Sequence, residues 1–510
     1  MKKIFKLLMN RAFTAGLAVL IQIIWLYMLF YRVGLLSTYT NIVLHIVAVI
    51  LVLHLINKKM NPSFKLAWTF VIFLFPLLGL LLYGLFGRSE LTKRTREKMN
   101  RVHKELEPLL ASQEAYEQEL QRLDASVAQQ VYYIRKWAGF PVYKHTDTQY
   151  FKCGEEMFPV MLEEIRKAEK FIFLEYFILK EGVMYDEIIR LLIEKAQAGV
   201  EVRLIYDDFG CVSTMPTHFY RSLQKYGIKC AAFNTVRPFM SIVMNNRDHR
   251  KILVVDGKAA FTGGINISDE YINRVTRYGY WKDTGISVRG EGVWSFTCMF
   301  LEMWNYIIRS SEDYGRFKAE WADGERIEDG FVQPYGDTPL DHEKTGENVY
   351  MNIISHAKRY VYIFTPYLIV DHAMLVTLCN AAKRGIDVRI VTPGIPDKKL
   401  VYLLTQADYE QLIENGVRIY QYTPGFIHAK SFVCDDEIAV VGTINMDYRS
   451  LYLHFEDGVY CYRSKAVMQL KEDTVDVINS SEEITAEWCR HRNIIVRMMQ
   501  AVLRLLAPLL

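Results

Sequence analysis

The stretch NNRDHRKILVVDGKAAFTGGIN, residues 245–266, places a His-x-Lys pair before an apolar strand and a Gly-x-x-Asn sequence after it. The stretch GFIHAKSFVCDDEIAVVGTIN, residues 425–445, has His, Lys, Asp, Gly and Asn at the same spacing. The two His residues are 179 positions apart, and in each stretch the Asn follows its His by 17 positions. Two copies of so long a pattern indicate an internal duplication.

The segments around these stretches predict an α/β fold. Three successive segments in each half have the pattern of strand, helix and strand: 169–179, 185–199 and 200–207, then 358–369, 371–385 and 386–393. A parallel sheet with crossover helices requires this order. We therefore expect two duplicated α/β/α halves, 136–340 and 341–485, that share one active site.

The N-terminal segment 1–88 is apolar and predicts two or three transmembrane helices. Residues 12–31 and 66–86 carry no charge, and in 38–56 only His45 and His54 can become positively charged. Each is 19 to 21 residues long, which is enough to cross about 30 Å of hydrocarbon. The basic residues are balanced between the two sides, so the topology stays open. We expect a multi-pass protein of the cell membrane.

Two further helical regions are expected outside the catalytic halves. Residues 89–135 predict a charged linker whose basic residues follow directly on the last apolar segment, where an anionic bilayer would attract them. Residues 486–510 predict an amphipathic helix, in which Arg490, Arg497 and Arg504 recur every seven residues. This helix could lie on the bilayer surface or pack on the catalytic halves.

The residue types of the repeated stretches suit chemistry on a phosphodiester. Each half supplies one His, one Lys and one Asn: His249, Lys251 and Asn266, then His428, Lys430 and Asn445. One imidazole can attack phosphorus and form a phosphohistidine, while the other protonates the leaving alkoxide and then deprotonates the incoming alcohol. The two ammonium groups and the two amides would bind the non-bridging oxygens.

Four acidic residues complete the predicted site. Asp256 and Asp435 follow the His-x-Lys strands, and Gly257 after Asp256 makes a turn role as plausible as a catalytic one. Asp283 and Glu456 lie 34 and 28 residues after the His of their own half. Each is a candidate to bind the second ring nitrogen of a His and fix its tautomer, with ordinary surface acids as the alternative.

The sequence predicts no metal site and no cofactor. The 8 Cys residues include no Cys-x-x-Cys pair, and no group of His residues has the spacing of metal ligands. In the predicted site the two Lys residues supply the positive charge that a metal ion supplies elsewhere.

These motifs resemble those of the phospholipase D superfamily, and within it the bacterial cardiolipin synthases. The similar segments are NPSFKLAWTFVIFLFPLLGLLLYGLFGR, YDDFG, RDHRKILVVDG, TPYLI and GTINMDYRSLYLHFE. The resemblance implies two HKD motifs, with His249 as the nucleophile and His428 as the acid and base. It implies transfer of a phosphatidyl group from one phosphatidylglycerol to another, which yields cardiolipin and glycerol. The apolar stretch 12–31 is a departure, because many members carry two membrane segments.

Other enzymes could use the same residues. A phospholipase D, or a phosphatidyltransferase with another alcohol acceptor, differs only in what accepts the phosphatidyl group. A nuclease of the superfamily is disfavoured because apolar segments precede the catalytic halves. We therefore expect phosphatidylglycerol and an anionic phospholipid bilayer as partners, and no nucleic acid; the sequence does not indicate an oligomeric state.

Overall fold

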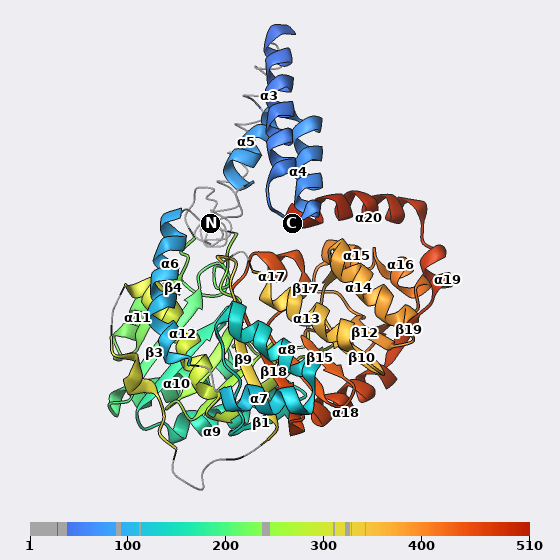
Figure 1. Ribbon diagram of the computed structural model, residues 1–510. Coiled ribbons are helices and arrows are strands. Elements are labelled where there is room, and N and C mark those ends of the chain that lie inside the picture. Colours follow the sequence, from blue (N-terminus) through green and yellow to red (C-terminus); the bar gives the residue numbers. More distant parts are fainter. Residues whose placement is uncertain are drawn as a thin grey trace.

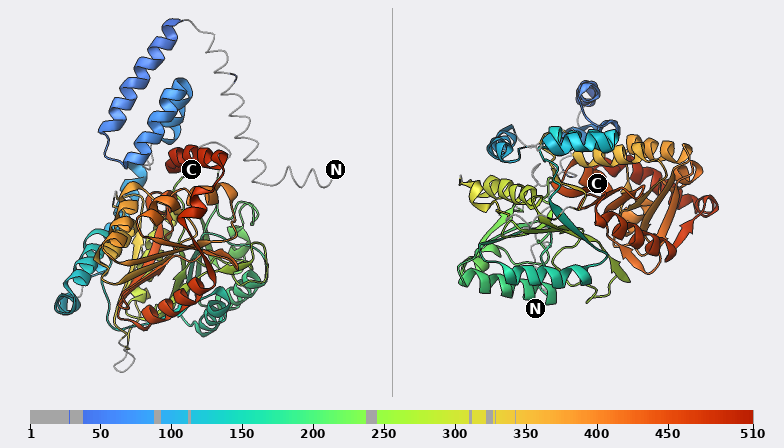
Figure 2. Two further views of the ribbon diagram at one scale, coloured as in Figure 1. Left: turned by 90° about the vertical axis from the view of Figure 1, so that its right-hand side faces the viewer. Right: turned by 60° about the horizontal axis from the view of Figure 1, so that its bottom comes forward.

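Two mixed α/β halves form the body of the protein in the computed structural model, and a helical stalk projects from them (Figure 1). The structure describes residues 38–87, 93–111, 114–236, 245–309, 312–321, 329–341 and 343–509, together with residues 28 and 327. The predicted α/β duplication is confirmed. Figure 2 shows the two sheets side by side, so that residues from both halves can meet at their boundary.

The first half contains a seven-stranded sheet in the order β1-β8-β6-β5-β2-β3-β4. Its strands are β1 (Thr146–Phe151), β2 (Phe171–Tyr176), β3 (Glu201–Asp207), β4 (Lys229–Phe233), β5 (Lys251–Val255), β6 (Ala259–Gly263) and β8 (Gly285–Gly290). Its helices are α9 (Gly154–Lys167), α10 (Val183–Gln197), α11 (Tyr220–Gln224) and α12 (Val293–Ile308). Strands β2, β3 and β4 are parallel, whereas β5 runs antiparallel to β2. The predicted strand, helix and strand over 169–207 are thus present.

The second half contains an eight-stranded sheet in the order β19-β13-β12-β10-β15-β16-β18-β9. Its strands are β9 (Phe331–Asp337), β10 (Tyr360–Phe364), β12 (Asp387–Pro393), β13 (Arg418–Tyr422), β15 (Ser431–Cys434), β16 (Ile438–Gly442), β18 (Glu456–Tyr462) and β19 (Ser481–Ile484). Its helices are α13 (Thr345–His356), α14 (His372–Lys383), α15 (Lys399–Thr405), α16 (Tyr409–Glu414), α17 (Tyr448–Tyr452) and α18 (Lys465–Asn479). The β15–β16 hairpin corresponds to β5–β6, which shows the duplication directly.

The boundary between the halves differs from the prediction. Strand β9, residues 331–337, lies within the predicted first half (136–340), but it pairs antiparallel with β18 of the second sheet. The boundary therefore lies before Phe331. The sequence could not show this, because the pairing partner of an edge strand is set by contacts more than a hundred residues away.

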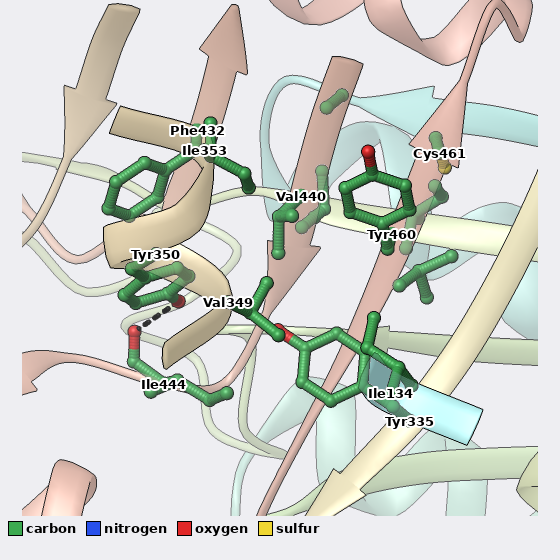
Figure 3. Packing of buried hydrophobic residues seen from close by; sticks show 14 of the residues in the cluster. Ile134, Tyr335, Val349, Tyr350, Ile353, Phe432, Val440, Ile444, Tyr460 and Cys461 are labelled. Carbon is green, nitrogen blue, oxygen red and sulfur yellow. Dashed lines mark hydrogen bonds between the residues drawn. The ribbon is translucent and has the colours of Figure 1, made fainter. Parts of the chain in front are cut away.

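Helix α13 packs against the second sheet and helps to position the end of β16 (Figure 3). The ring of Tyr350 stacks on Phe432 of β15, with 4.0 Å between the ring centroids. Its hydroxyl donates a hydrogen bond of 2.9 Å to the carbonyl of Ile444. Because Ile444 precedes Asn445, this buried contact fixes the backbone of a predicted site residue.

The N-terminal segment forms a helical stalk of α3 (Thr38–Asn57), α4 (Pro62–Leu74) and α5 (Pro76–Phe86). The predicted span 66–86 is not one helix: it is divided at Pro76, which lacks an N–H group and forces Phe75 out of the helical conformation. Within the described residues no helix is both long enough and apolar enough to cross a bilayer. The predicted transmembrane helices are therefore not confirmed, and the predicted span 12–31 falls outside the described residues apart from Met28.

The predicted charged linker is helical, and it runs alongside the body. It contains α6 (Lys93–Leu106), α7 (Glu114–Leu123) and α8 (Ala125–Tyr133). Helix α6 contacts α12 of the first half, and α8 contributes Val127 and Val131 to the core shared with the second half. The linker is therefore packed against the body along its length.

The C-terminal segment contains α19 (Ala486–Arg490) and α20 (Ile494–Leu506), and α20 lies across the foot of the stalk (Figure 1). The polar side of α20 faces the body: Arg497 pairs with Glu410 at 2.9 Å, and Arg504 pairs with Asp408. The opposite side is apolar and exposed, and it consists of Ile494, Ile495, Met498, Met499 and Val502. Helix α20 is therefore amphipathic with its apolar side turned to the surroundings, whereas Arg490 of the predicted stripe lies in the separate helix α19.

The structure gives Asp256 and Asp435 a place at hairpin turns, which was the alternative to the catalytic role for Asp256. Asp256 lies at the end of β5 away from Lys251, about 16 Å along the strand. Its carboxylate accepts three backbone N–H bonds of 2.8 Å from residues 169–171. Asp435 binds the N–H groups of residues 358–360 in the same way. Both residues have positive φ, 53° and 57°, so they form the turns of the two hairpins and anchor β2 and β10.

We predict that Asp256→Ala lowers the free energy of unfolding by about 2 kcal/mol or more, because three charge-assisted hydrogen bonds are lost. Asp256→Asn should lower it less, since the amide oxygen still accepts a hydrogen bond and Asn tolerates positive φ. Denaturant unfolding measures the effect, and activity per folded molecule should change by less than about ten-fold. A loss of activity without a loss of stability would restore Asp256 to the catalytic residues.

Candidate active site

The two halves are joined at the site by two short parallel strand contacts. In one contact, β7 (Tyr280–Lys282) of the first half pairs with β14 (Gly425–Ile427) of the second. In the other, Asp248 of the first half bridges Phe455 of the second. Each contact ends on a predicted catalytic His: the His428 N–H donates to the Lys282 carbonyl at 2.7 Å, and the His249 N–H donates to the Phe455 carbonyl at 2.9 Å.

At these contacts, each candidate carboxylate meets the His of the opposite half. Glu456 follows Phe455, and each of its two carboxylate oxygens lies 2.9 Å from Nδ1 of His249. Asp283 follows Lys282 and lies 2.6 Å from Nδ1 of His428. Each carboxylate therefore contacts the His of the opposite half, which the sequence distances do not indicate. The physical reason is the strand pairing, which places the residue after each strand beside the His of the opposite half.

The His249–Glu456 pair is rigidly held. Ser450 and Thr443 each donate a hydroxyl hydrogen bond of 2.5 Å to the Glu456 carboxylate. Burial alone would raise the pKa of Glu456, but the hydrogen bonds and positive charges around it outweigh this and lower the pKa below its usual range. Glu456 is therefore ionised and can accept a hydrogen bond from a proton on Nδ1 of His249, which leaves the lone pair on Nε2.

The His428–Asp283 pair has fewer hydrogen-bonding partners. One oxygen of Asp283 faces His428, and the other accepts the backbone N–H of Thr284 at 2.8 Å. A Cβ atom at position 264 would lie 2.0 Å from the Asp283 carboxylate, so only glycine leaves room for this carboxylate. Burial lowers the pKa of both catalytic histidines, His249 to about 3 and His428 to about 4, so both rings are neutral in the free site at neutral pH.

The two Lys residues lie in the same buried centre. Lys251 donates a hydrogen bond to the carbonyl of His249, and Lys430 donates one to the carbonyl of His428. Burial lowers the pKa of Lys251 to about 8 and that of Lys430 to about 7. The charge of Lys251 lowers the pKa of both His428 and Lys430, so the two halves form one electrostatic centre. Such a centre favours an anion.

The two predicted Asn residues are differently engaged. Asn266 accepts the N–H of Ile178 at 3.0 Å and donates to the Tyr271 hydroxyl at 2.7 Å, which leaves one of its N–H groups for a ligand. The side-chain oxygen of Asn445 is buried and has no hydrogen-bond partner among the described residues. An amide in this position can turn its NH₂ group towards an oxyanion.

The sequence reasoning missed the rings beside the catalytic histidines. Trp281 lies 5.4 Å from His428 and His454 lies 5.5 Å from His249, centroid to centroid, with similar tilts of 47° and 43°. Both residues stand two positions before a carboxylate, so the repeated ring-x-acid order in YWKD and LHFE was an available signal. The pair is also unequal: a titratable imidazole flanks His249, whereas an indole flanks His428.

His249, His454 and Glu456 are the residues of the described chain that could hold a metal ion, since their ligand atoms lie within 4.8 Å of one another. A metal ion there would replace the hydrogen bond between Nδ1 of His249 and Glu456. Nδ1 of His454 lies 3.8 Å from Glu456, and both of its ring nitrogens are buried without a hydrogen-bond partner among the described residues. The hydrogen bond to His249 accounts for the Glu456 carboxylate without a metal.

Two α/β halves that each bring a His-Lys pair to one buried, anion-favouring centre define the phospholipase D class of proteins. Comparison with known proteins agrees. The family model "Cardiolipin synthase, PLD-like domain" matches residues 161–277 and 350–475. The model "Phospholipase D-nuclease N-terminal" matches residues 46–88. The crystal structure of phosphatidylserine synthase from Haemophilus influenzae superposes with a TM-score of 0.55 at 15% identity, covering 71% of this chain and 93% of that one, and so shares the fold.

Relatives of higher identity narrow the family. A cardiolipin synthase of Geobacillus sp. (strain WCH70) is 33% identical over 469 residues, which are 91% of this chain and 92% of that protein. An uncharacterized protein of Streptococcus mutans is 44% identical over 459 residues, which are 90% of this chain and 99% of that protein. The chain belongs to the cardiolipin synthase family of the phospholipase D superfamily.

The pairing of each His with a carboxylate of the opposite half can be tested by NMR spectroscopy. In protein labelled with ¹⁵N at the histidine rings, Asp283→Asn should shift the ring signals of His428 and leave those of His249 in place, because Asp283 contacts only the His428 ring. Glu456→Gln is the matched control and should shift the signals of His249. Signals are assigned by replacing each His with Gln. If Asp283→Asn moved only the His249 signals, Asp283 would instead pair with the His of its own half.

Proposed function

We propose that this chain transfers the phosphatidyl group of one phosphatidylglycerol to a second, forming cardiolipin and glycerol through a phosphohistidine. The observation that carries the proposal is the pair of His–carboxylate contacts between the halves, around two buried Lys residues. The proposal also draws on membership in a family whose relatives include cardiolipin synthases. No cofactor enters the reaction.

In the first step, Nε2 of His249 attacks phosphorus of the bound phosphatidylglycerol. The new N–P bond forms while the P–O bond to the glycerol headgroup breaks, and His428 gives its proton to the departing oxygen. His428 must be protonated for this step. The phosphodiester anion supplies the negative charge that raises the pKa of His428 when substrate binds.

In the second step, a hydroxyl group of another phosphatidylglycerol attacks the phosphohistidine. His428, now neutral, accepts the hydroxyl proton as the O–P bond forms and the N–P bond breaks, so His249 leaves as a neutral imidazole. Lys251 and Lys430 bind the non-bridging oxygens in both steps, and Asn266 and Asn445 add amide N–H groups. Asp283 and Glu456 hold the rings and stabilise their protonated forms.

We also propose that the catalytic halves lie against the cell membrane, with segment 1–88 as a multi-pass anchor in an anionic phospholipid bilayer. The stalk supports this proposal, because α3 exposes Ile42, Val43, Ile46, Ile50 and Leu53. The apolar side of α20 is exposed beside the foot of the stalk. Exposed apolar surface of this extent on neighbouring elements is typical of a lipid contact.

A phospholipase D that transfers the phosphatidyl group to water would use the same residues. It is less favoured, because several relatives at 32–33% identity are cardiolipin synthases.

The product balance tests the proposed function. In phosphatidylglycerol vesicles, the purified protein should release cardiolipin and glycerol at about one to one, with little phosphatidic acid. Added glycerol should reverse the reaction, since the covalent intermediate conserves the energy of the phosphodiester. Phosphatidic acid as the main product, with no response to glycerol, would identify the protein as a hydrolase.

A soluble p-nitrophenyl phosphodiester separates the roles of the two histidines. Because p-nitrophenolate leaves without a general acid, Asp283→Asn should slow its release in the first turnover by less than about ten-fold. Glu456→Gln should slow that release by about 100-fold or more, because His249 loses the carboxylate that fixes its nucleophilic tautomer. Rapid-quench measurement of the first turnover distinguishes the two. The opposite order of effects would make His428 the nucleophile.

A further inference from the structure

A cavity of about 340 Å³ lies where the helical stalk meets the catalytic halves. Phe64, Trp68, Val71 and Leu82 of the stalk form an apolar wall. Asn245 of the first half and Arg449 of the second form a polar part of the lining. The volume is at the lower end for small-molecule sites, which suits part of one lipid rather than two whole lipids.

The stalk is docked where it forms this cavity. Asn61, at the turn between α3 and α4, donates to Asp371 at 2.7 Å and to the Tyr452 hydroxyl at 2.8 Å. The ring of Phe64 packs edge-on against both Tyr448 and Tyr452, at centroid distances of 5.7 and 5.8 Å. These contacts fix α4 on α17, the short helix just before Glu456. The cavity is therefore a formed feature of the fold.

The lining of the cavity continues into the strands that carry the catalytic residues. Asn245 stands four residues before His249, which is at most about 14 Å along an extended chain. Leu453, which also lines the cavity, stands three residues before Glu456. The side chain of the intervening Asn246 donates to the Leu453 carbonyl at 2.9 Å. The cavity is thus lined by the two segments that carry His249 and Glu456.

The charges indicate which molecule this is. The proposed reaction has two phosphates: the one that is transferred, and the one that the acceptor lipid keeps. Lys251 and Lys430 serve the first. Arg449 has an exposed side chain and brings a second cationic group to the lining, which also contains the amide of Asn245 and the apolar residues of the stalk. A phosphodiester attached to acyl chains matches this arrangement.

The geometry points to this cavity as the binding site for the acceptor lipid, with its phosphate at Arg449 and the start of its acyl chains against the stalk. The inference rests on the proposed function and specifies its second step. The bound acceptor presents its terminal glycerol hydroxyl to the phosphohistidine. That hydroxyl gives its proton to His428 as the O–P bond forms and the N–P bond breaks. Filling this site with lipid also keeps water from the intermediate.

The test measures how the intermediate divides between lipid and water. With full-length protein in phosphatidylglycerol vesicles, Arg449→Gln should lower the ratio of cardiolipin to phosphatidic acid about ten-fold, the effect of losing one charge-assisted contact. Val71→Trp fills the cavity from the stalk side and should lower the same ratio. Val47→Trp is the matched control: Val47 is 44% exposed on α3, away from the cavity, and the ratio should not change.

Two outcomes would overturn the inference. In one, the ratio stays the same in Arg449→Gln and Val71→Trp. In the other, glycerol release and cardiolipin fall in parallel at a constant ratio, which would make the cavity the site of the donor lipid. A wild-type protein that forms only phosphatidic acid would instead overturn the proposed function. The wild-type products therefore test the reaction, and the variant ratios test the cavity.

Discussion

The hydrogen bonds that each catalytic histidine makes with the opposite half are the constraint on which the site depends. The His249 N–H binds the Phe455 carbonyl and the His428 N–H binds the Lys282 carbonyl, so each histidine is fixed at the backbone by the other sheet. The carboxylate that orients each ring follows directly in that same strand. Neither half alone can therefore supply an oriented imidazole. Assembly of the two halves and assembly of the site are one event.

The contact between the halves also brings several charged groups together in one buried space. Two ammonium groups and two carboxylates lie around the histidines, and removal from water disfavours the charged form of each. Burial lowers the pKa of Lys251 and Lys430 to about 8 and 7, so their charge is held only weakly in the free site. A phosphodiester anion adds a negative charge that stabilises the charged forms of both Lys residues. Substrate binding therefore stabilises the protonation states that the chemistry requires.

The stalk and the catalytic halves act together in the proposed reaction, because their contact forms the cavity beside the reacting strands. The docking of Asn61 and Phe64 on α17 ties the position of the apolar helices to the segment that carries Glu456. Lipid bound at the stalk is thereby held at a defined distance from the histidines. Such positioning raises the effective concentration of a lipid hydroxyl over that of water.

The sequence by itself determined the α/β duplication, the two His-x-Lys strands and the chemistry of the site, because these depend on local periodicity and on residue types repeated at equal spacing. It offered Asp283 and Glu456 as candidate orienting carboxylates but did not indicate which His each one contacts. Only the tertiary structure could decide this, since pairing between strands of different halves leaves no trace in sequence distance. The same holds for β9, whose partner β18 lies far along the chain, and for the rings of Trp281 and His454. Asp256 shows the opposite limit: its place in the motif suggested catalysis, whereas its three backbone hydrogen bonds assign it to the turn. Spacing along the chain predicts which groups a site contains, but the packing of the two sheets decides which groups touch.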